Sequence, residues 1–331
     1  MIGSRPIPRT GTQHIDQPVA VPLAQKVKRM PDSDADLRRR RLEATELTRV
    51  GPQPEFFRGS WASVTNIFEY RELLTLLVRR ELRARYKNSS LGFVWSLIKP
   101  IAQLLIYFIV LGQVMGMAKG IPEFAIFVFS GLTIWSFFNE IVAGGTGAVV
   151  GNAGLIKKVY VPREIFPLST VGGAIVNFGI QFVVLVAGTV LAGDLPISRR
   201  IVYVPLSVLL IIVFGTALAL LLSAVNVYLR DVQHLIEVVM MILFWASPIV
   251  YSFSFVANYL AGSWIGELYL ANPITLAVLG FQHGMWMAGA TQPFPSHMPE
   301  RLAIALIIST GLLWLSQRIF ARLEGNFAQE L

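Results

Sequence analysis

Residues that could carry catalytic chemistry are few in this chain of 331 residues, and they are scattered. The absence of cysteine excludes thiolate nucleophiles, thiolate metal ligands and disulfides. The four histidines lie far apart, at His14, His234, His283 and His297. No His, Asp and Glu group has metal-ligand spacing, and neither a Gly-x-Ser-x-Gly elbow nor a Gly-x4-Gly-Lys-Ser/Thr phosphate loop occurs. The sequence therefore predicts no enzyme, no metal site and no bound cofactor.

Two short charged segments between apolar stretches are candidates for contact with another protein. The first, NAGLIKKVYVPREIFPL at 152–168, is basic and amphipathic, and its Pro162 suits the first turn of a following helix. The second, NVYLRDVQ at 226–233, carries an adjacent arginine and aspartate. Composition alone leaves each one as an ordinary loop or as a lever that passes a push from a soluble partner to the helices. The candidate coupling residues are Lys157, Lys158, Tyr160, Arg163, Glu164, Arg230 and Asp231.

The elements that must position these segments are apolar and long. The chain is 54% hydrophobic and 15% charged, with a mean hydropathy of +0.59, whereas soluble domains are about 25% charged. A helix needs about 20 apolar residues to cross a bilayer. Six stretches meet that length, near 92–115, 124–144, 166–191, 201–225, 233–253 and 301–321. The sequence therefore predicts an all-α integral membrane protein with six transmembrane helices.

The placement of lysine and arginine predicts the orientation, because cytoplasmic loops carry an excess of both. The segment before the first span and the loops after spans two, four and six hold 11 of these residues, and the opposite loops hold four. Both termini are therefore expected in the cytoplasm. Ionisable residues are scarce within the spans, and Glu140 is expected near a span end. That scarcity disfavours an ion-coupled carrier and favours an energy supply outside the chain.

The segment before the first span is basic, with 17 Lys/Arg and 10 Asp/Glu in residues 1–90. Residues 1–60 are expected to form a disordered cytoplasmic tail with no nucleic-acid site, and 61–331 to form the transmembrane domain. An apolar stripe within 66–88 predicts an amphipathic helix, which we expect to lie in the membrane interface with its apolar face in lipid. The charged residues of its other face include Glu72, Arg79, Arg83 and Arg85.

Two further features concern a path through the membrane. The segment 254–300 contains an apolar run broken by Pro273 and Gly284, which is typical of a re-entrant or outward-facing helix pair rather than a span. Aromatic rings could line a path for sugars, whose C–H faces stack on flat rings, although lipid-facing rings are the alternative interpretation for each one. The candidate channel-lining residues are Trp95, Tyr107, Phe108, Phe244, Trp245 and Tyr251.

Four segments resemble the ABC-2 type transport permeases. They are RYKNSSLGFVWSLIKP at 85–100, LIKKVYVPREIFPL at 155–168, the stretch from Arg230–Asp231 to FWASPIVY, and FARLEGNFAQEL at the C-terminus. The last of these resembles the tail of the polysaccharide-exporting branch. With its long Arg/Pro-rich N-terminal segment, the chain looks most like the membrane subunit of the actinobacterial cell-wall galactan exporter.

The resemblance implies a homodimer that pairs with two copies of a separate ATP-binding subunit, which would hold ATP and Mg. The amphipathic helix and the 152–168 segment would dock on that subunit. A polymer on a lipid carrier would leave between the protomers, through an outer gate formed by the helices between the last two spans. The gate residues would be Asn272, Pro273, Phe281 and His283, where many relatives have an arginine after the aromatic residue.

The function that follows is export of a lipid-linked polysaccharide across the cytoplasmic membrane, with cell-wall galactan or an O-antigen-like polymer as cargo. An ABC-2 exporter of drugs or lipids shares the fold and the coupling loops, and is the alternative within transport. A membrane glycosyltransferase would need acidic catalytic residues that face a lipid-linked donor. The acidic residues of this chain lie singly at span ends, which disfavours that alternative.

Overall fold

A computed structural model describes residues 69–86, 94–158, 161–193, 196–260 and 263–331, and these residues form helices without a strand. The tail predicted over 1–60 lies outside the described residues. The described part contains five helical segments long and apolar enough to cross a membrane. They are α4 (Trp95–Tyr107) with the π-helix η2 (Phe108–Val114), α5 (Phe124–Gly151), α7 (Ile165–Leu191), the 3-10 turn η4 (Arg199–Val202) with α8 (Tyr203–Tyr228), and α13 (Met298–Leu323).

The fifth predicted span differs from the prediction. Helix α9 (Val232–Trp245) has 14 residues and ends eight residues before the predicted end at 253. At 1.5 Å per residue it rises about 21 Å, which is less than the roughly 30 Å of a hydrocarbon core. Residues 246–252, which follow it, are not helical. The predicted fifth crossing therefore corresponds to a short helix continued by irregular backbone.

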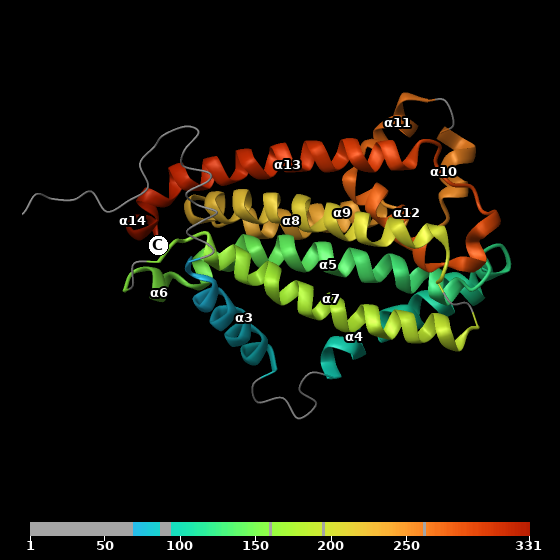
Figure 1. Cartoon of the computed structure of the whole chain (residues 1–331), viewed down its shortest axis with the longest axis horizontal. Helices are drawn as coiled ribbons and strands as arrows, with labels where there is room; N and C mark the ends of the chain where they lie inside the picture. The colour runs from blue at the N-terminus through green and yellow to red at the C-terminus, as the bar shows by residue number, and fades with distance from the viewer. Residues whose placement is uncertain (1–68, 87–93, 159–160, 194–195, 261–262) are drawn as a thin grey trace, which may run out of the picture. The chain divides into compact units, whose positions relative to one another are not determined.

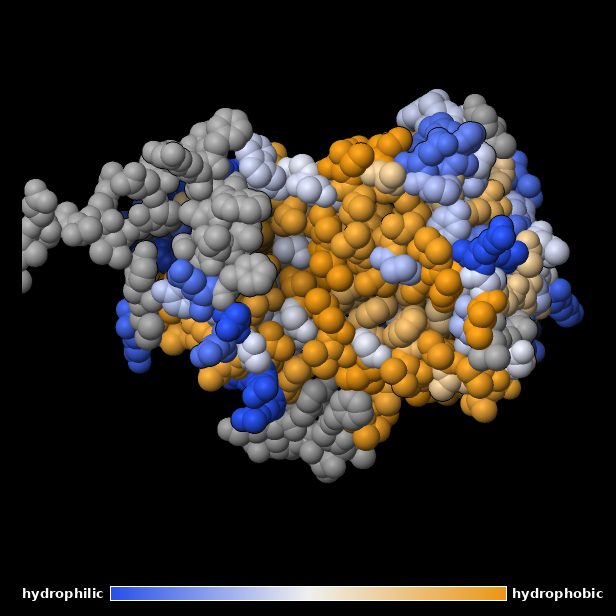
Figure 2. All heavy atoms as spheres, in the orientation of Figure 1, coloured by the Kyte–Doolittle hydropathy of each residue, from blue (hydrophilic) through white to orange (hydrophobic). Residues whose placement is uncertain are grey.

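The long helices pack around α8, which contacts α5, α12 (Pro273–Met285) and α13, while α5 also packs against α7 (Figure 1). One apolar cluster fills the middle of the bundle and the end where α5, α8 and α13 begin, and a second fills the end where they finish. Figure 2 shows the matching surface, with apolar side chains gathered between polar ends. The prediction of an all-α membrane protein is confirmed.

The irregular backbone at 246–252 is buried rather than exposed to lipid. Ile249 and Val250 are at most 1% exposed. The side-chain amide of Gln282, on α12, donates to the carbonyl oxygens of Pro248 at 3.2 Å and Ile249 at 3.3 Å. Non-helical backbone at membrane depth is stable only where protein or water satisfies its polar groups. Gln282 supplies that partner here, and Gly131 on α5 leaves the space for it.

The bent helix pair between the last two spans enters and leaves the bundle at one end. Helices α11 (Trp264–Ala271) and α12 meet at an angle of 75°. Glu267 on α11 pairs with Arg301 in the first turns of α13, and Gly284 near the end of α12 contacts Val204 at the start of α8. Gly280 lies near both Ser207 on α8 and Leu302 on α13, so α8 and α13 begin at the same end of the bundle. The bent pair is therefore either a broken span or the predicted re-entrant pair, and its contacts at one end of the bundle favour the latter.

The amphipathic helix exists as α3 (Arg71–Tyr86), but its apolar stripe is partly covered by protein. Leu77 is only 3% exposed, and Val78 packs against Gly172 near the start of α7. The expectation that this whole face lies in lipid is therefore wrong. Gly172 has no side chain, so α7 leaves room for Val78 at this point. This part of the apolar face of α3 therefore packs on the bundle and not against lipid.

The close approach at Gly131 gives a test of the buried backbone segment. A Cβ atom at Gly131 would lie 2.5 Å from the Ile249 oxygen and 2.7 Å from the Gln282 amide nitrogen. We expect Gly131→Ala to lower the free energy of unfolding by about 1–3 kcal/mol, because neither group can move without losing a hydrogen bond. Thermal unfolding of the purified protein measures this loss.

Gly144→Ala, on the same helix, is the matched control. Its new Cβ atom would lie 3.8 Å from its nearest neighbour, Thr170, which is an ordinary contact. Alanine is also favoured over glycine inside a helix, so this variant should be as stable as the parent or more so. Equal losses in both variants would show that helix α5 is merely intolerant of alanine.

Candidate functional site

The predicted coupling residues gather at the end of the bundle where α5 finishes and α7 begins, which we call the coupling end. Lys157 and Lys158, directly after the short helix α6 (Ala153–Ile156), are exposed. Arg230 and Asp231 are exposed in the tight turn between α8 and α9. The amide of Asn226 donates to the Thr146 carbonyl of α5 at 3.1 Å, which fixes this turn beside the end of α5. Tyr160 lies outside the described residues.

Glu164 faces the protein interior instead, and Arg163 is half-buried beside the C-terminal segment. Glu164 is 5% exposed, and its carboxylate accepts a hydrogen bond of 3.2 Å from Gln317 on α13. The guanidinium of Arg163 lies 5.8 Å from the centre of the Phe327 ring. Burial raises the pKa of Glu164, and the hydrogen bond from Gln317 only partly offsets this effect. These two residues therefore join the coupling segment to the C-terminal helix rather than present it to solvent.

The C-terminal segment closes over the coupling segment. Phe327, in the short helix α14 (Phe327–Glu330), is fully buried in the cluster that contains Ile156 and Ile165. The Tyr228 hydroxyl at the end of α8 donates to the Leu323 carbonyl at 2.9 Å. The sequence pattern does not predict this role for the tail. The available signal was Phe320 and Phe327, two aromatic residues seven positions apart in an otherwise charged tail.

Helix α3 is tied to the same region. Glu72, Arg79 and Arg83 are exposed, as predicted for its charged face, and the Arg85 side chain lies outside the description. Arg80, which the sequence analysis did not single out, donates to the side-chain oxygen of Asn152 at the start of α6. Movement of the coupling segment would therefore reach α3 directly.

The six predicted channel-lining aromatic residues divide into two groups. Trp95 on α4 is 45% exposed and Trp245 at the end of α9 is 56% exposed. The other four have ring or hydrogen-bond partners within the protomer. Tyr107 stacks with Phe244 at 6.0 Å, Phe108 lies 6.5 Å from Phe124, and the Tyr251 hydroxyl donates to the Trp245 carbonyl at 2.9 Å. Of the six, only the two tryptophans are exposed, and the Trp245 ring also meets the Phe244 ring edge-on with centres 5.5 Å apart.

Glu140 lies deeper in the membrane than the sequence predicts. Helix α5 runs to Gly151, not to 144, so Glu140 is 11 residues or about 17 Å from its end. The amide of Asn177, near the middle of α7, donates to the Glu140 carboxylate at 2.7 Å. The expected position near a span end is therefore wrong. Ionisable residues at this depth are expensive and usually functional, and Ser136 and Asn139 extend the same partly exposed face.

The predicted gate residues hold α12 in place. The Asn272 side chain accepts a hydrogen bond of 3.0 Å from the Ile274 amide, which caps α12, and Pro273 occupies its first turn. Phe281 is fully buried and contacts the Phe178 ring at 5.9 Å. His283 stacks on Phe294 with ring centres 3.8 Å apart.

Comparison with known proteins identifies the family. The model for the ABC-2 type transporter family matches residues 72–286, so the chain belongs to this family. It is similar to the O-antigen export system permease protein RfbA of Myxococcus xanthus, with 31% identity over 81% of this chain and 98% of the relative. A protein of the same name from Klebsiella pneumoniae is 26% identical over 78% of this chain and 95% of the relative.

A shorter match is to the polysialic acid transport protein KpsM of Escherichia coli, 33% identical over 29% of this chain and 35% of the relative. Membership of the ABC-2 family makes this chain a multi-pass membrane component of a transporter that works with an ATP-binding partner. The resemblance of the four sequence segments is thus confirmed at the level of the family.

The burial of Glu164 predicts a pH-dependent effect on stability. Because the folded-state pKa is raised above the ordinary value of 4.5, the ionised carboxylate costs folding free energy at neutral pH. Glu164→Gln removes the charge and keeps an oxygen for Gln317. We expect the variant to unfold at a higher temperature than the parent at neutral pH. The difference should narrow as the pH falls and disappear below 4.5, where the carboxyl group is protonated in both the folded and the unfolded state.

Glu72→Gln on the exposed face of α3 is the control. The difference between its melting temperature and that of the parent should not narrow as the pH falls. The comparison uses melting curves of the parent and both variants across this pH range. A Glu164→Gln variant that is less stable than the parent at neutral pH would contradict the raised pKa of Glu164.

Proposed function

We propose that this chain is the membrane subunit of an ABC exporter that moves a lipid-linked polysaccharide out across the cytoplasmic membrane. The observation that carries the proposal is the coupling end, where exposed charges stand on a segment joined to α3, α8 and α13. Such a segment can pass movement of a soluble ATPase to several helices at once. The names of the O-antigen and polysialic acid relatives supply the cargo class.

The proposed assembly is a homodimer with two ATP-binding subunits, with both termini in the cytoplasm. Its support is the distribution of charge and apolar surface. The coupling end carries the exposed lysines expected on the cytoplasmic side. Helices α4 and α9 both present large exposed apolar side chains, among them Ile106, Met241 and Ile242. These faces would pack against the second protomer or contact lipid.

The proposed path runs along the partly exposed face of α5, between α4 and α9. Trp95 and Trp245 would offer rings on which sugars stack, and the polar face around Glu140 would hydrogen-bond sugar hydroxyls at mid-membrane depth. A polar face of this kind suits a hydroxyl-rich polymer better than the drug or lipid of the alternative function. For the cargo we propose cell-wall galactan, on the resemblance of the N-terminal composition alone.

Depletion of the protein in its host tests the function. We expect a lipid-linked polymer to accumulate inside the cell and its surface form to disappear, because synthesis continues while export stops. Extraction of lipid-linked glycans followed by sugar analysis measures both pools. If no lipid-linked glycan accumulates on depletion, the export function is wrong.

Charge reversal at Lys157 and Lys158 tests the docking role. We expect the Lys157→Glu, Lys158→Glu double variant to lose co-purification with the ATP-binding subunit, while its own melting temperature stays unchanged because both side chains are exposed. Lys119→Glu, an exposed lysine between η2 and α5, is the matched control and should retain the partner. Full partner recovery by the double variant would refute the docking role.

Removal of the two open tryptophans tests the path. We expect Trp95→Ala with Trp245→Ala to lower the export rate several-fold while the complex continues to hydrolyse ATP, because the two rings on which sugars would stack are removed. Trp314→Ala, 40% exposed on α13, is the control, because α13 packs against α8 and α12. Unchanged export in the double variant would exclude these rings from the path.

A further inference from the structure

A partly open cavity of about 350 Å³ lies at the end of the bundle opposite the coupling end. Its walls come from α10 (Phe253–Leu260), α11, the segment 293–296 and Arg301 of α13. None of the residues assigned to coupling, path or gate lines it. Pockets that bind small molecules typically measure about 300–1,000 Å³, so this one is at the small end of the range.

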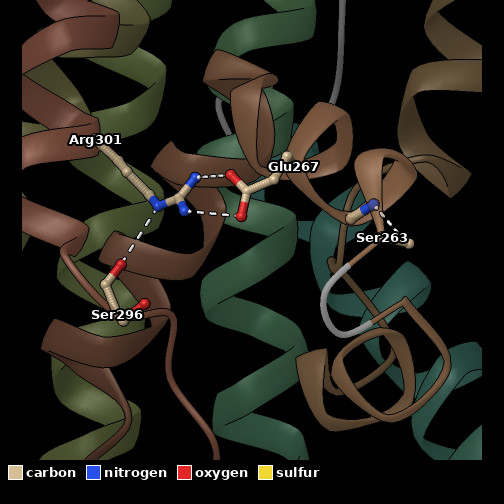
Figure 3. A network of polar contacts seen from close by, with 5 residues as sticks. Ser263, Glu267, Ser296 and Arg301 are labelled. Carbon is tan, nitrogen blue, oxygen red and sulfur yellow. Dashed lines mark hydrogen bonds and ion pairs between the residues drawn. The ribbon is translucent and has the colours of Figure 1, made fainter.

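An ion pair forms the polar side of the cavity. The Arg301 guanidinium donates to both carboxylate oxygens of Glu267, at 2.9 and 3.2 Å, and its third nitrogen donates to the Ser296 carbonyl at 3.3 Å. Figure 3 shows these contacts, with Ser263 at the start of the same helix as Glu267. The Ser263 hydroxyl caps α11 by accepting a bond from Gly266. The pair thus joins α11, the 293–296 segment and α13.

The charge balance of the cavity favours a neutral ligand. Arg301 is the only cation among its described lining residues, and each of its three nitrogens already has an acceptor. A phosphate or carboxylate ligand would therefore meet the Glu267 carboxylate without a free positive charge to bind. The carboxylate oxygens keep further lone pairs, which accept hydrogen bonds from hydroxyl groups.

The remaining surface of the cavity is apolar and partly aromatic. Phe253 and Phe294 line it, with Val256 and Leu270 beside them. The Phe294 ring is held by its stack on His283, which in turn lies 5.4 Å from Tyr203 edge-on. A fixed aromatic ring on one side and a hydroxyl-accepting carboxylate on the other are the two features that a sugar ring requires.

We propose that this cavity is a binding site for one or two residues of a neutral carbohydrate. The assignment rests on the proposed function, and places the site where the polymer leaves the protein. Phe253 and Phe294 also line a second, smaller cavity beside Gln282 and His283. An occupant of the outer cavity would therefore press on rings that contact α12, so that the emerging polymer would hold the gate helix in a displaced position.

The test uses the full chain with its ATP-binding subunit in lipid nanodiscs. The probes are a neutral hexose tetrasaccharide and a uronic-acid tetrasaccharide of the same length, observed by saturation-transfer difference NMR. We expect saturable binding of the neutral probe. Ala257→Trp and Val256→Trp, which fill the cavity from α10, should each weaken it at least tenfold. Tyr259→Ala, 86% exposed on the same helix and outside the cavity, should leave it unchanged.

Glu267→Gln gives a signature that loss of structure alone would not produce. It frees the Arg301 charge, so binding should shift from the neutral probe toward the uronic-acid probe. Melting curves show which filling variants are folded, and any one folded variant decides the result. Neutral binding that survives a filled cavity, absence of saturable binding, or parent preference for the acidic probe would each overturn the proposal. Polymer accumulation on depletion would leave the export function standing in all three cases.

Discussion

The fold depends on the need to satisfy every backbone polar group inside the membrane. In the described part of the chain, helices meet most of this need, but at 246–252 α9 stops short and two carbonyls are left without helical partners. Gln282, a residue of the re-entrant helix, supplies the missing donor for Pro248 and Ile249. Helix α12 therefore completes the hydrogen bonding of the segment that follows α9.

The two ends of the bundle are built differently, in keeping with their proposed tasks. At the coupling end, a buried carboxylate and a buried phenylalanine fasten the coupling segment to the C-terminal helix, so that a push on its exposed lysines reaches α13 and α8 together. At the other end, one ion pair joins α11 to α13 across a small cavity. The first arrangement suits force transmission, and the second suits a part that must open.

Hydropathy was sufficient to predict the crossing helices, because length and apolar content are local properties of the chain. It failed after Trp245, since residues 246–252 are mostly apolar although they are not helical, and two of their carbonyl groups are satisfied by a residue 33 or 34 positions away. It also placed Glu140 too near a helix end, because the small, weakly apolar residues after 144 continue α5. The stripe on α3 was correct in spacing, but a sequence pattern cannot distinguish lipid from the side of α7 as its partner.

If α12 acts as the proposed gate, the hydrogen bonds of Gln282 also bear on how it opens without leakage. If α12 moves away, the carbonyls of Pro248 and Ile249 lose their donor in a region with no other described side-chain donor to them. Water must then enter to solvate them, so opening and wetting occur together. When α12 returns, the Gln282 amide would replace that water at the two carbonyls. A passing polymer would thus travel in a hydrated opening that closes dry behind it, which preserves the ion gradients of the membrane between transport cycles.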